Sequence, residues 1–470
     1  MAKSTSVKSS RKLSGHAAHT QDAVVQGLPG VVQRPIKITM MGAGSGFTPR
    51  LVNDVLRIPG NQGGVIALVD IDTDRLRTMQ KLIVKLVAKL KQDKKWQVVA
   101  SPDRTQVLKG SDYVVNCIEV SGLECVRHDN DIPLKYGIDQ CIGDTIGPGG
   151  LFKALRTAPT WLKVLADVER ICPQAWVLNY TNPMSILCLA AAKSSKAKVI
   201  GLCHSVQHSS HQLAEYLGAP YHELKWRCAG INHMAWFTEL THRGHDMYPV
   251  LKQKVEDDAE LLAKDPVRFD AMKYFDYFVT ESSGHFSEYL PYYRKRQELI
   301  TQHCGARYNG ESGFYANGWP QWRQDNDNLR RKYLSGEEPL DMSRSWEYAS
   351  FIIEAIETNS PVKIYATVMN NGLISNLPYD NVVEVPCIVD SNGIAPIHFG
   401  YLPAQCAALC CTNLHMIGLA AEACINRSKD MAFKSLLLDP LSAAVCSPKE
   451  IKAMTDKLFE AEKDFLPMYK

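Results

Sequence analysis

The chain has 470 residues, of which 45% are hydrophobic and 22% are charged, and its formal net charge is +3. These values are ordinary for a globular protein and leave ample apolar material for a large core. The 53 basic and 50 acidic residues nearly balance, which argues against a nucleic-acid partner. No apolar run approaches the roughly 20 residues that cross a bilayer, so we expect no membrane partner.

The N-terminal region differs in composition from the rest of the chain. Residues 1–34 are rich in Ser, Lys, His and Gly and contain no acidic residue before Asp22, which predicts a disordered basic tail. The alternative is a transit peptide, because the start is basic and poor in acids but has no apolar secretory core. The 14 cysteines are scattered without paired spacing, which predicts reduced thiols in a cytoplasmic protein rather than a disulfide framework.

The first strand-like run, Lys37–Met41, leads into a glycine turn. Gly42 and Gly44, with Ser45, would let the backbone approach a pyrophosphate at the N-terminus of the next helix. Phe47 fills the usual third glycine position, and a glycine-rich turn after any strand has the same local pattern. The turn by itself is therefore compatible with a dinucleotide site and with an ordinary loop.

An acidic residue follows the second strand-like run, Val65–Val69. Asp70, with Asp72, is placed to accept hydrogen bonds from a ribose hydroxyl, and an acid here favours NAD over NADP because it would repel a 2′-phosphate. Thr73 or Asp74 is expected to cap the helix that follows. Together with the glycine turn, these residues predict a first βαβ unit that binds NAD.

Short apolar runs alternate with segments of helical spacing between residues 35 and 204. This alternation predicts an α/β fold with a Rossmann-type, doubly wound parallel sheet as an NAD-binding domain over residues 35–204. The expected strands are Lys37–Met41, Val65–Val69, Gln97–Ala100, Tyr113–Cys117, Trp176–Asn179 and Val199–Leu202. The expected helices are Arg50–Leu56, Asp74–Lys91, Gly149–Ile171 and Pro183–Ala192.

Beyond His204 the pattern changes to long helices with a few strands. We expect strands at Trp226–Phe237 and Lys363–Val368, and a hairpin of Val383–Val389 with Ala395–Phe399. No linker is visible, so residues 205–470 are predicted to form a substrate, metal and oligomerisation domain that packs continuously on the first.

Polar and metal-ligating residues follow three of the expected strands. Asn182 lies after the strand that ends at Asn179, Cys203 and His204 follow the next one, and His233 follows a third strand-like run. Groups at the carboxyl ends of neighbouring strands converge on the ligand crevice of an open α/β sheet. Each residue alone has a structural explanation, because a single Cys is usually a core residue and a single His is often simply hydrogen-bonded. Together they indicate a metal and substrate site, for which thiolate and imidazole are suitable ligands.

A series of longer motifs carries a specific resemblance. The chain resembles glycoside hydrolase family 4, the NAD- and metal-dependent glycosidases, and within it the melibiase-type α-galactosidases. The matching segments are Gly42-Ala43-Gly44-Ser45, Val69-Asp70-Ile71-Asp72, Asp144-Thr145-Ile146-Gly147-Pro148-Gly149-Gly150, Leu178-Asn179-Tyr180-Thr181-Asn182-Pro183-Met184, Gly201-Leu202-Cys203-His204-Ser205-Val206-Gln207, Cys228-Ala229-Gly230-Ile231-Asn232-His233-Met234, Tyr277-Phe278-Val279-Thr280-Glu281-Ser282-Ser283 and Asn376-Leu377-Pro378. The match runs from about residue 35 to the C-terminus.

The resemblance implies a Rossmann-type sheet joined to a lactate/malate-dehydrogenase-like α+β C-terminal domain, and an α-galactosidase that cleaves glycosidic bonds by an exception to the two-carboxylate scheme. Bound NAD⁺ would take a hydride from C3, which makes the C2 proton acidic. Removal of that proton, elimination of the C1 leaving group, addition of water and return of the hydride would complete the reaction without net consumption of oxidant.

The resemblance also implies a role for each candidate residue. Cys203 and His233 match the metal ligands; the donor set alone suggests zinc, but the family uses Mn²⁺. Asn182 matches a position that contacts sugar hydroxyls, and Tyr289 matches the base. His204 stands where phospho-sugar members carry the acidic proton donor, and Asp144 is another possible acid or hydroxyl ligand.

One departure from the family pattern concerns the sugar. After Tyr289 the chain continues with a more basic run than is usual in the branch, which ends in Arg294-Lys295-Arg296. A cationic cluster at the pocket mouth would favour a uronic acid through a bidentate Arg294 or Arg296. The alternative is a solvated helix end.

Several functions therefore remain open at this point. An α-galactosidase acting on small oligosaccharides or glycosides is favoured, with an α-galacturonidase, α-glucuronidase or α-glucosidase on the same scaffold as the alternative. A plain 2-hydroxyacid-type dehydrogenase would instead accumulate NADH, and a catalytically idle nucleotide-binding subunit would tolerate loss of Cys203. Members of the family usually form homo-oligomers, which implies a homodimer or homotetramer.

Overall fold

The structure is a computed structural model that describes residues 18–19 and 27–470. Its strands are β1 (Ala18–His19), β2 (Ile36–Met41), β3 (Gly64–Val69), β4 (Trp96–Ser101), β5 (Tyr113–Asn116), β6 (Trp176–Asn179), β7 (Lys198–Gly201), β8 (Leu224–Ile231), β9 (Met234–His242), β10 (His245–Asp246), β11 (Phe278–Val279), β12 (Val362–Met369), β13 (Val382–Asp390) and β14 (Gly393–Pro396). They join one 14-stranded sheet whose main path runs β10-β9-β8-β13-β12-β7-β6-β5-β2-β3-β4.

The N-terminal half of the sheet is parallel. Strands β2 to β7 lie in the order β7-β6-β5-β2-β3-β4, and all five pairings between them are parallel. This is the strand order of a doubly wound dinucleotide-binding fold, whose switch point lies between β2 and β5. Most residues of β2, β3 and β5 are buried, because helices cover both faces of such a sheet. The predicted α/β fold class is confirmed.

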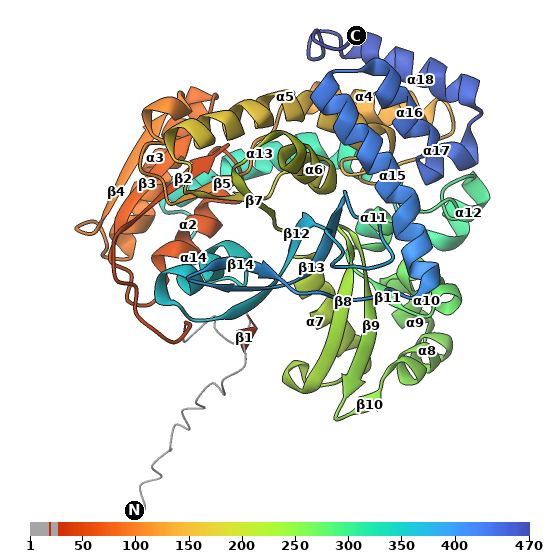
Figure 1. Cartoon of the computed structure of the whole chain (residues 1–470), viewed down its shortest axis with the longest axis horizontal. Helices are drawn as coiled ribbons and strands as arrows, with labels where there is room; N and C mark the ends of the chain where they lie inside the picture. The colour runs from red at the N-terminus through yellow and green to blue at the C-terminus, as the bar shows by residue number, and fades with distance from the viewer. Residues whose placement is uncertain (1–17, 20–26) are drawn as a thin grey trace, which may run out of the picture.

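The helices cover the sheet in layers (Figure 1). In this view α5 and α6 lie above the central strands, and α2 and α14 lie below them. The helices are α2 (Thr48–Leu56), α3 (Thr73–Lys89), α4 (Leu123–Leu134), α5 (Gly147–Ile171), α6 (Met184–Ser194), α7 (Ser205–Leu217), α8 (Tyr248–Asp257), α9 (Ala259–Lys264), α10 (Pro266–Phe275), α11 (Ser283–Glu288), α12 (Gln297–His303), α13 (Phe314–Ser335), α14 (Tyr348–Thr358), α15 (Ala404–Asn426), α16 (Lys429–Leu437), α17 (Pro440–Val445) and α18 (Pro448–Ala461).

The C-terminal half extends the same sheet with antiparallel strands. β12 continues the sheet beside β7 through the pair Thr367 and Gly201, and β13 meets β8 through Glu384 and Gly230. The sequence predicted one strand over Trp226–Phe237, whereas the structure has the β8–β9 hairpin with its turn at residues 232–233. The run is apolar on both sides of this turn, so periodicity alone could not reveal the reversal. The predicted hairpin after β13 is present, although β14 ends at Pro396.

Part of the predicted N-terminal tail is packed rather than disordered. Leu28 and Val32 are buried in the main core, and Arg34 forms ion pairs with Asp112 and Glu357. Residues 18–19 pair with β12. The remainder of the tail, residues 1–17 and 20–26, lies outside the described residues. The local composition is polar, so the contacts that hold residues 27–34 come from segments far away in the sequence.

Helix α15 is the one described helix that is long and apolar enough, by length and composition, to cross a membrane. This differs from the expectation that no such run exists, because the helix mixes small residues and cysteines with a few polar ones. Half of its apolar window is buried within the structure, and it packs against α5, α6 and α16. Packing against other helices explains its apolar character.

Asp439 provides a test of electrostatics within the fold. It caps α17 by accepting the backbone N–H of Ser442, and burial raises its pKa from 3.8 to about 6. A raised pKa means that ionisation destabilises the folded state, an effect that is absent below about pH 4 and complete above about pH 6. Asp439→Asn keeps the capping oxygen and removes the charge. We therefore expect the free energy of unfolding of Asp439→Asn, relative to that of the unmodified protein, to rise by about 3 kcal/mol as the pH rises from about 4 to about 6.

Urea unfolding at several pH values measures this difference. Asp103 is a matched control, since it caps a 3₁₀ turn through Thr105 but hydrogen bonds from Thr105 lower its pKa. Asp103→Asn should lose stability relative to the unmodified protein as the pH rises. A pH-independent effect of Asp439→Asn would contradict the assignment.

Candidate active site

At two positions in the glycine turn after β2, neighbouring atoms lie too close to the backbone to leave room for a side chain. A Cβ atom on Gly42, whose φ is +72°, would lie 2.5 Å from the carbonyl oxygen of Cys117. A Cβ atom on Gly44 would lie 2.8 Å from a carboxylate oxygen of Asp70. The following helix, α2, has no side chain that caps its N-terminus and no acidic residue in its first turn. Its free N–H groups and the open turn together form a suitable cradle for an anionic group.

Gly42→Ala should abolish this cradle. We expect loss of dinucleotide binding and about 1–3 kcal/mol lower free energy of unfolding, because the new methyl group meets backbone and the residue must keep a left-handed φ. Calorimetric titration with NAD⁺ and thermal unfolding measure the two effects. Gly110→Ala is the matched control, since its φ is +76° but no atom lies within 4 Å of the added carbon. Equal effects of both substitutions on NAD⁺ binding would argue against the cradle.

The aspartates after β3 hold the turn in place. Asp70 accepts the Gly44 N–H at 2.6 Å and the Asp72 N–H at 2.9 Å. Asp72, rather than the predicted Thr73 or Asp74, caps α3 by accepting the N–H groups of Asp74 and Arg75. Ser45 lies in the turn and accepts the N–H of Phe47.

An arginine that the sequence did not indicate also contacts the glycine turn. Arg330 of α13 donates to the carbonyl oxygen of Gly44 at 2.7 Å. It lies 286 residues away in the chain, and no local motif marks it.

Cys203, His233 and Glu281 form a compact cluster beyond the ends of β7, β8 and β11. Cys203 Sγ lies 3.5 Å from His233 Nε2 and 4.0 Å from Glu281 Oε2, and the last two atoms are 3.5 Å apart. His233 and Glu281 have φ values of 65° and 72°, a conformation rarely adopted by residues other than glycine. Such strained residues cluster at functional sites. The predicted Cys–His pair is thus brought together, with a third donor that the sequence analysis did not select.

Backbone pairing places Glu281 in this cluster. The hairpin partner β9 pairs with β11, and Thr280 forms two hydrogen bonds with the backbone of Ala235. Residue 281 is therefore held opposite the β8–β9 turn that carries His233. The motif Tyr277–Ser283 contains this acid, but nothing in the local sequence shows that β11 joins the sheet.

The protonation states suit a cation-binding site. Burial lowers the pKa of His233 to about 4, so its ring is neutral. Burial and the nearby Glu281 raise the pKa of Cys203 well above its usual value. Burial would raise the pKa of Glu281 too, but the histidines around it, His233 and His285, bring it down to about 2. A neutral imidazole, a carboxylate and a thiol that only a nearby cation would deprotonate are the components of a divalent metal site.

Asp144 is the centre of a second polar group beside the cluster. It accepts hydrogen bonds from Thr145 at 2.7 Å, Lys153 at 3.3 Å and Asn182 at 3.5 Å. Burial opposes its ionisation, but Lys153 and His285 lower its pKa to about 2. An ionised Asp144 is suited to accept hydrogen bonds from a substrate hydroxyl rather than to donate a proton. Asp144 and Lys153 also line a pocket, together with Val126, Asp129, Asn130, Ile142, Gly143, Tyr315, Ala316 and Trp319.

Helix α11 brings the predicted base close to both groups. Tyr289 follows the last turn of α11, is 2% exposed and lies near the acidic side chains of Asp144, Glu288 and Glu281. Burial raises the pKa of Tyr289 well above 10, so the phenol is neutral unless a cation lies beside it. His285, four residues earlier, lies 3.4 Å from Glu281 and 3.9 Å from Asp144. His285 links the two acids, and the sequence analysis did not select it.

Another buried acid of α11 positions the loop before Asp144. Glu288 accepts the backbone N–H groups of Cys141, Ile142 and Gly143 at 2.6–3.1 Å. The helix that carries Tyr289 is thereby tied to the segment that carries Asp144.

His204 lies at the edge of the site as the N-cap residue of α7. Its Nδ1 is 3.4 Å from Glu347 Oε1, and its side chain is 46% exposed. The hydrogen bond with Glu347 raises the pKa of His204 to about 9. A charged imidazole at neutral pH is able to donate a proton, which is the role that the resemblance implies for this position. Glu347 precedes α14, which is remote in sequence and was not anticipated.

Arg294 does not take part in a cationic cluster at the pocket mouth. Arg294 is fully buried in an ion pair with Asp139, and it donates to the Gly310 carbonyl oxygen at 2.8 Å. Arg296 is 63% exposed beside Glu298. Arg294 therefore holds loops together, and it is not available to bind a uronate.

Two family models match this chain. The model described as family 4 glycosyl hydrolase matches residues 37–219, and the model described as family 4 glycosyl hydrolase C-terminal domain matches residues 228–442. The chain belongs to glycosyl hydrolase family 4. The resemblance noted from the motifs is confirmed.

Curated relatives of this family 4 hydrolase span nearly its whole length. The alpha-galactosidase of Bacillus subtilis (strain 168) is 40% identical over 440 residues, which cover 92% of this chain and 100% of the relative. The alpha-galactosidase of Rhizobium meliloti (strain 1021) is 37% identical, with 92% and 89% covered. An alpha-galacturonidase of Lachnoclostridium phytofermentans is 27% identical, with 92% and 97% covered.

Solved structures confirm the fold of this family 4 hydrolase. A 6-phospho-alpha-glucosidase from gut microorganisms, in complex with NAD and Mn²⁺, superposes with a TM-score of 0.78 at 21% identity and covers 93% of this chain and 100% of the other. The 6-phospho-beta glucosidase of Thermotoga maritima has a TM-score of 0.74 at 23% identity, with 92% and 99% covered.

Proposed function

We propose that this family 4 hydrolase is an NAD- and Mn²⁺-dependent α-galactosidase that acts on small oligosaccharides or glycosides. The observation that carries the proposal is the cluster of Cys203, His233 and Glu281, which follows β7, β8 and β11 in the same sheet whose strand β2 leads into the glycine turn. The two alpha-galactosidases at 37–40% identity support the sugar, and the family 4 structure that contains NAD and Mn²⁺ supports the cofactors.

The residues present fit both cofactors. The ligand atoms of Cys203, His233 and Glu281 all lie within 4.8 Å of one another and offer sulfur, nitrogen and oxygen donors. Zinc is the usual partner of thiolate and imidazole, and the carboxylate of Glu281 supplies the oxygen donor that suits Mn²⁺. The pyrophosphate of NAD would lie on Gly42, Gly44 and Ser45 at the start of α2. Asp70 and Asp72 would lie beside the ribose and accept hydrogen bonds from its hydroxyl groups.

The bound cofactors would supply a reversible hydride acceptor for C3 and positive charge beside the C2 and C3 oxygens. Tyr289, as a phenolate beside that charge, removes the C2 proton. His204 donates its proton to the leaving-group oxygen, and Glu347 holds its ring. Asn182 and Asp144 bind sugar hydroxyls, with Lys153 keeping Asp144 ionised.

A glycosidase assay with nitrophenyl α-galactoside tests the proposal. We expect activity only with catalytic NAD⁺, Mn²⁺ and a reductant that keeps Cys203 reduced, slower turnover when C2 carries deuterium, and release of galactose without net NADH. Full activity after exhaustive removal of both cofactors would refute the mechanism. Steady accumulation of NADH would identify a plain dehydrogenase.

The identity of the sugar is tested with the same protein. Nitrophenyl α-galacturonide, α-glucuronide and α-glucoside should be poorer substrates than the galactoside. Arg294 is occupied by Asp139, so it is not available as one of the two arginines that would favour a uronic acid. Higher kcat/KM for a uronide would move the assignment to the alternative.

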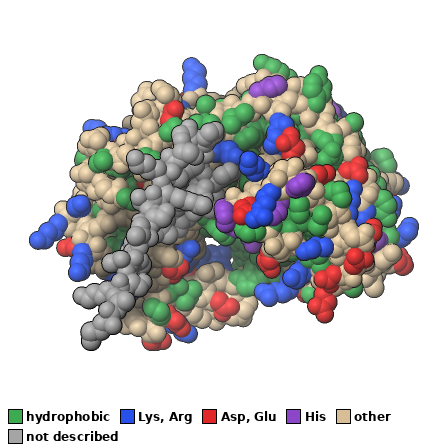
Figure 2. All heavy atoms as spheres, turned by 90° about the horizontal axis from the view of Figure 1, so that it is seen from below, with side chains coloured by type: hydrophobic (Ala, Val, Ile, Leu, Met, Phe, Trp, Pro, Cys, Tyr) green, Lys and Arg blue, Asp and Glu red, His purple; other side chains and the backbone are tan. Residues whose placement is uncertain are grey.

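We further propose a cytoplasmic homodimer or homotetramer, with residues 35–204 as the NAD-binding domain and 205–470 as the substrate, metal and oligomerisation domain. All 14 cysteines are free, which supports a reducing compartment. On the face shown in Figure 2, outside the grey residues, basic and acidic side chains are interspersed, so no broad basic patch suggests nucleic acid as a partner. Light scattering of the purified protein measures the oligomeric state.

A further inference from the structure

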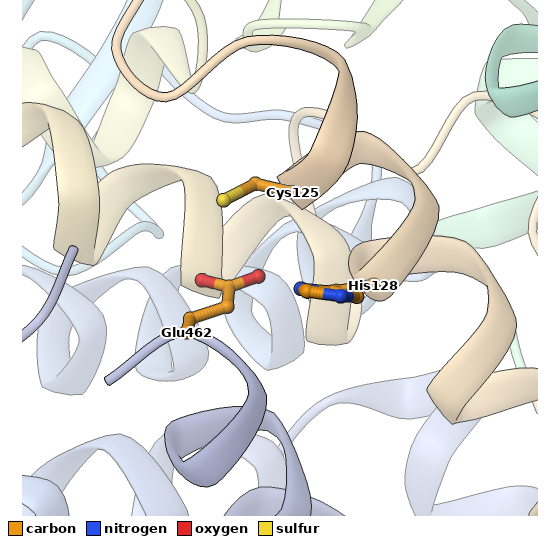
Figure 3. Close-up of side chains that lie close together, drawn as sticks. All are labelled: Cys125, His128 and Glu462. Atoms are coloured by element: carbon orange, nitrogen blue, oxygen red, sulfur yellow. The ribbon is translucent and has the colours of Figure 1, made fainter. Parts of the chain in front are cut away.

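A second group of metal-ligating side chains lies away from the candidate active site. Cys125 and His128 are three residues apart on one face of α4, and Glu462 directly follows α18. Their ligand atoms all lie within 4.8 Å of one another. Figure 3 shows the three side chains converging on one space from these two elements. In Figure 1, α4 and α18 lie side by side near the C-terminus, and they are in contact.

Two polar atoms that face this space have no hydrogen-bond partner. His128 Nδ1 and Glu462 Oε1 are both buried, and neither accepts a hydrogen bond. The whole Glu462 side chain is buried as well. The other oxygen of Glu462 accepts a hydrogen bond from Arg156 at 2.5 Å. Buried polar atoms are almost always paired, so two unpaired ones from different elements in one place indicate a missing ligand.

The charges around the space also suit a cation. Arg156 is shared between Glu462 and Asp129, which it contacts at 2.6 Å, so one guanidinium faces two buried carboxylates. A divalent cation that converts the Cys125 thiol to a thiolate would make the whole group electrically neutral.

We propose that Cys125, His128 and Glu462 bind a zinc ion that fastens α4 to the end of α18. Thiolate and imidazole favour zinc over Mn²⁺ or Mg²⁺, and three protein ligands leave the fourth tetrahedral position for water. On binding, the S–H bond of Cys125 breaks, its proton passes to solvent and a sulfur–zinc bond forms without any change of oxidation state. This site is separate from the proposed function and does not depend on it.

The zinc would also support the wall of the substrate pocket. Val126, Asp129 and Asn130 of α4 line the pocket that contains Asp144 and Lys153. Asp129 is held by Arg156, which also holds Glu462. The metal therefore acts as a positioning element for α4.

The experiment uses the full chain with two of the three active-site ligands replaced, Cys203→Ser and His233→Ala, so that the first metal site cannot hold Zn²⁺ tightly. After treatment with a chelator, Zn²⁺ should bind at about one ion per chain and raise the melting temperature, whereas Mg²⁺ should not. Co²⁺ should give the near-ultraviolet charge-transfer band of a thiolate ligand. Absence of stoichiometric Zn²⁺ binding in this background would overturn the proposal, whatever the outcome of the glycosidase assay.

Single substitutions in the same background assign the ligands. Cys125→Ser should abolish the Co²⁺–thiolate band, and His128→Gln should weaken Zn²⁺ binding; His128 is partly exposed, so the latter variant should fold. Cys172→Ser is the matched control, because Cys172 is also buried and burial raises the pKa of both thiols to about 11. Zn²⁺ binding and the band should survive in this control. A band that persists in Cys125→Ser would refute the assignment.

Discussion

Tyr289→Phe is expected to lower kcat by about 100- to 10,000-fold, the range that a general base contributes, with little change in KM. The phenol lies 2% exposed after α11 and near Cys203, Glu281 and Asp144, where a metal would lower its pKa and leave it as the base for C2. Phenylalanine keeps the packing and removes only the proton acceptor. Steady-state kinetics with nitrophenyl α-galactoside, together with NAD⁺ and Mn²⁺ titrations, separates loss of chemistry from loss of binding.

Tyr293 offers a matched control. It is 4% exposed on the same segment, and its phenol donates to Asp270 at 3.1 Å, outside the candidate site. Tyr293→Phe should lose at most the one hydrogen bond and keep kcat within a few-fold. If Tyr289→Phe retained full activity, another residue would have to be the base. A similar fall in both variants would point to a structural role of the segment.

Cys203→Ser is expected to reduce Mn²⁺ affinity by more than about 100-fold, and Glu281→Gln by about 10- to 100-fold. The thiolate is the strongest donor of the cluster, whereas the carboxylate supplies one oxygen and keeps His233 in place at 3.5 Å. Loss of negative charge from either residue leaves a buried cation less well compensated. Electron paramagnetic resonance of free Mn²⁺ measures the affinity, and the Mn²⁺ dependence of kcat gives an independent value.

Glu384 is the control for Glu281. It is a buried carboxyl close by, but burial raises its pKa to about 8, so it is protonated at neutral pH. Glu384→Gln replaces one neutral group by another and retains the contact with Asn232. Its Mn²⁺ affinity should be nearly unchanged. Unaltered Mn²⁺ affinity in Glu281→Gln would remove this residue from the ligand set.

The residues that the sequence analysis found are those with a strong local signal. Gly42 and Gly44 follow a strand, Asp70 ends the next one, and Cys203 and His233 stand in motifs that resemble the family. Strand order in the parallel, doubly wound part of the sheet then brings Gly42, Asp70 and Cys203 to one edge.

The site residues that the sequence analysis did not predict have no strong local sequence motif. Arg330 reaches Gly44 from α13, and Glu347 reaches His204 from the start of α14. Glu281 stands in a quoted motif, but its role depends on the pairing of β11 with β9. For Arg294 the sequence suggested a role that the structure does not support. The basic run was interpreted as a surface cluster, whereas Arg294 is buried in an ion pair with Asp139.

The sequence by itself determined the α/β class, the glycine turn, the family and the Cys–His pair, because these depend on periodicity and on residues close together in the chain. Only the tertiary structure decided that Glu281 and His285 join the pair, that residues 27–34 are packed, and that Cys125, His128 and Glu462 meet. The reason is physical: burial, ion pairing and pKa depend on which distant segments come into contact. Such contacts follow from the packing of the whole chain and leave no local pattern.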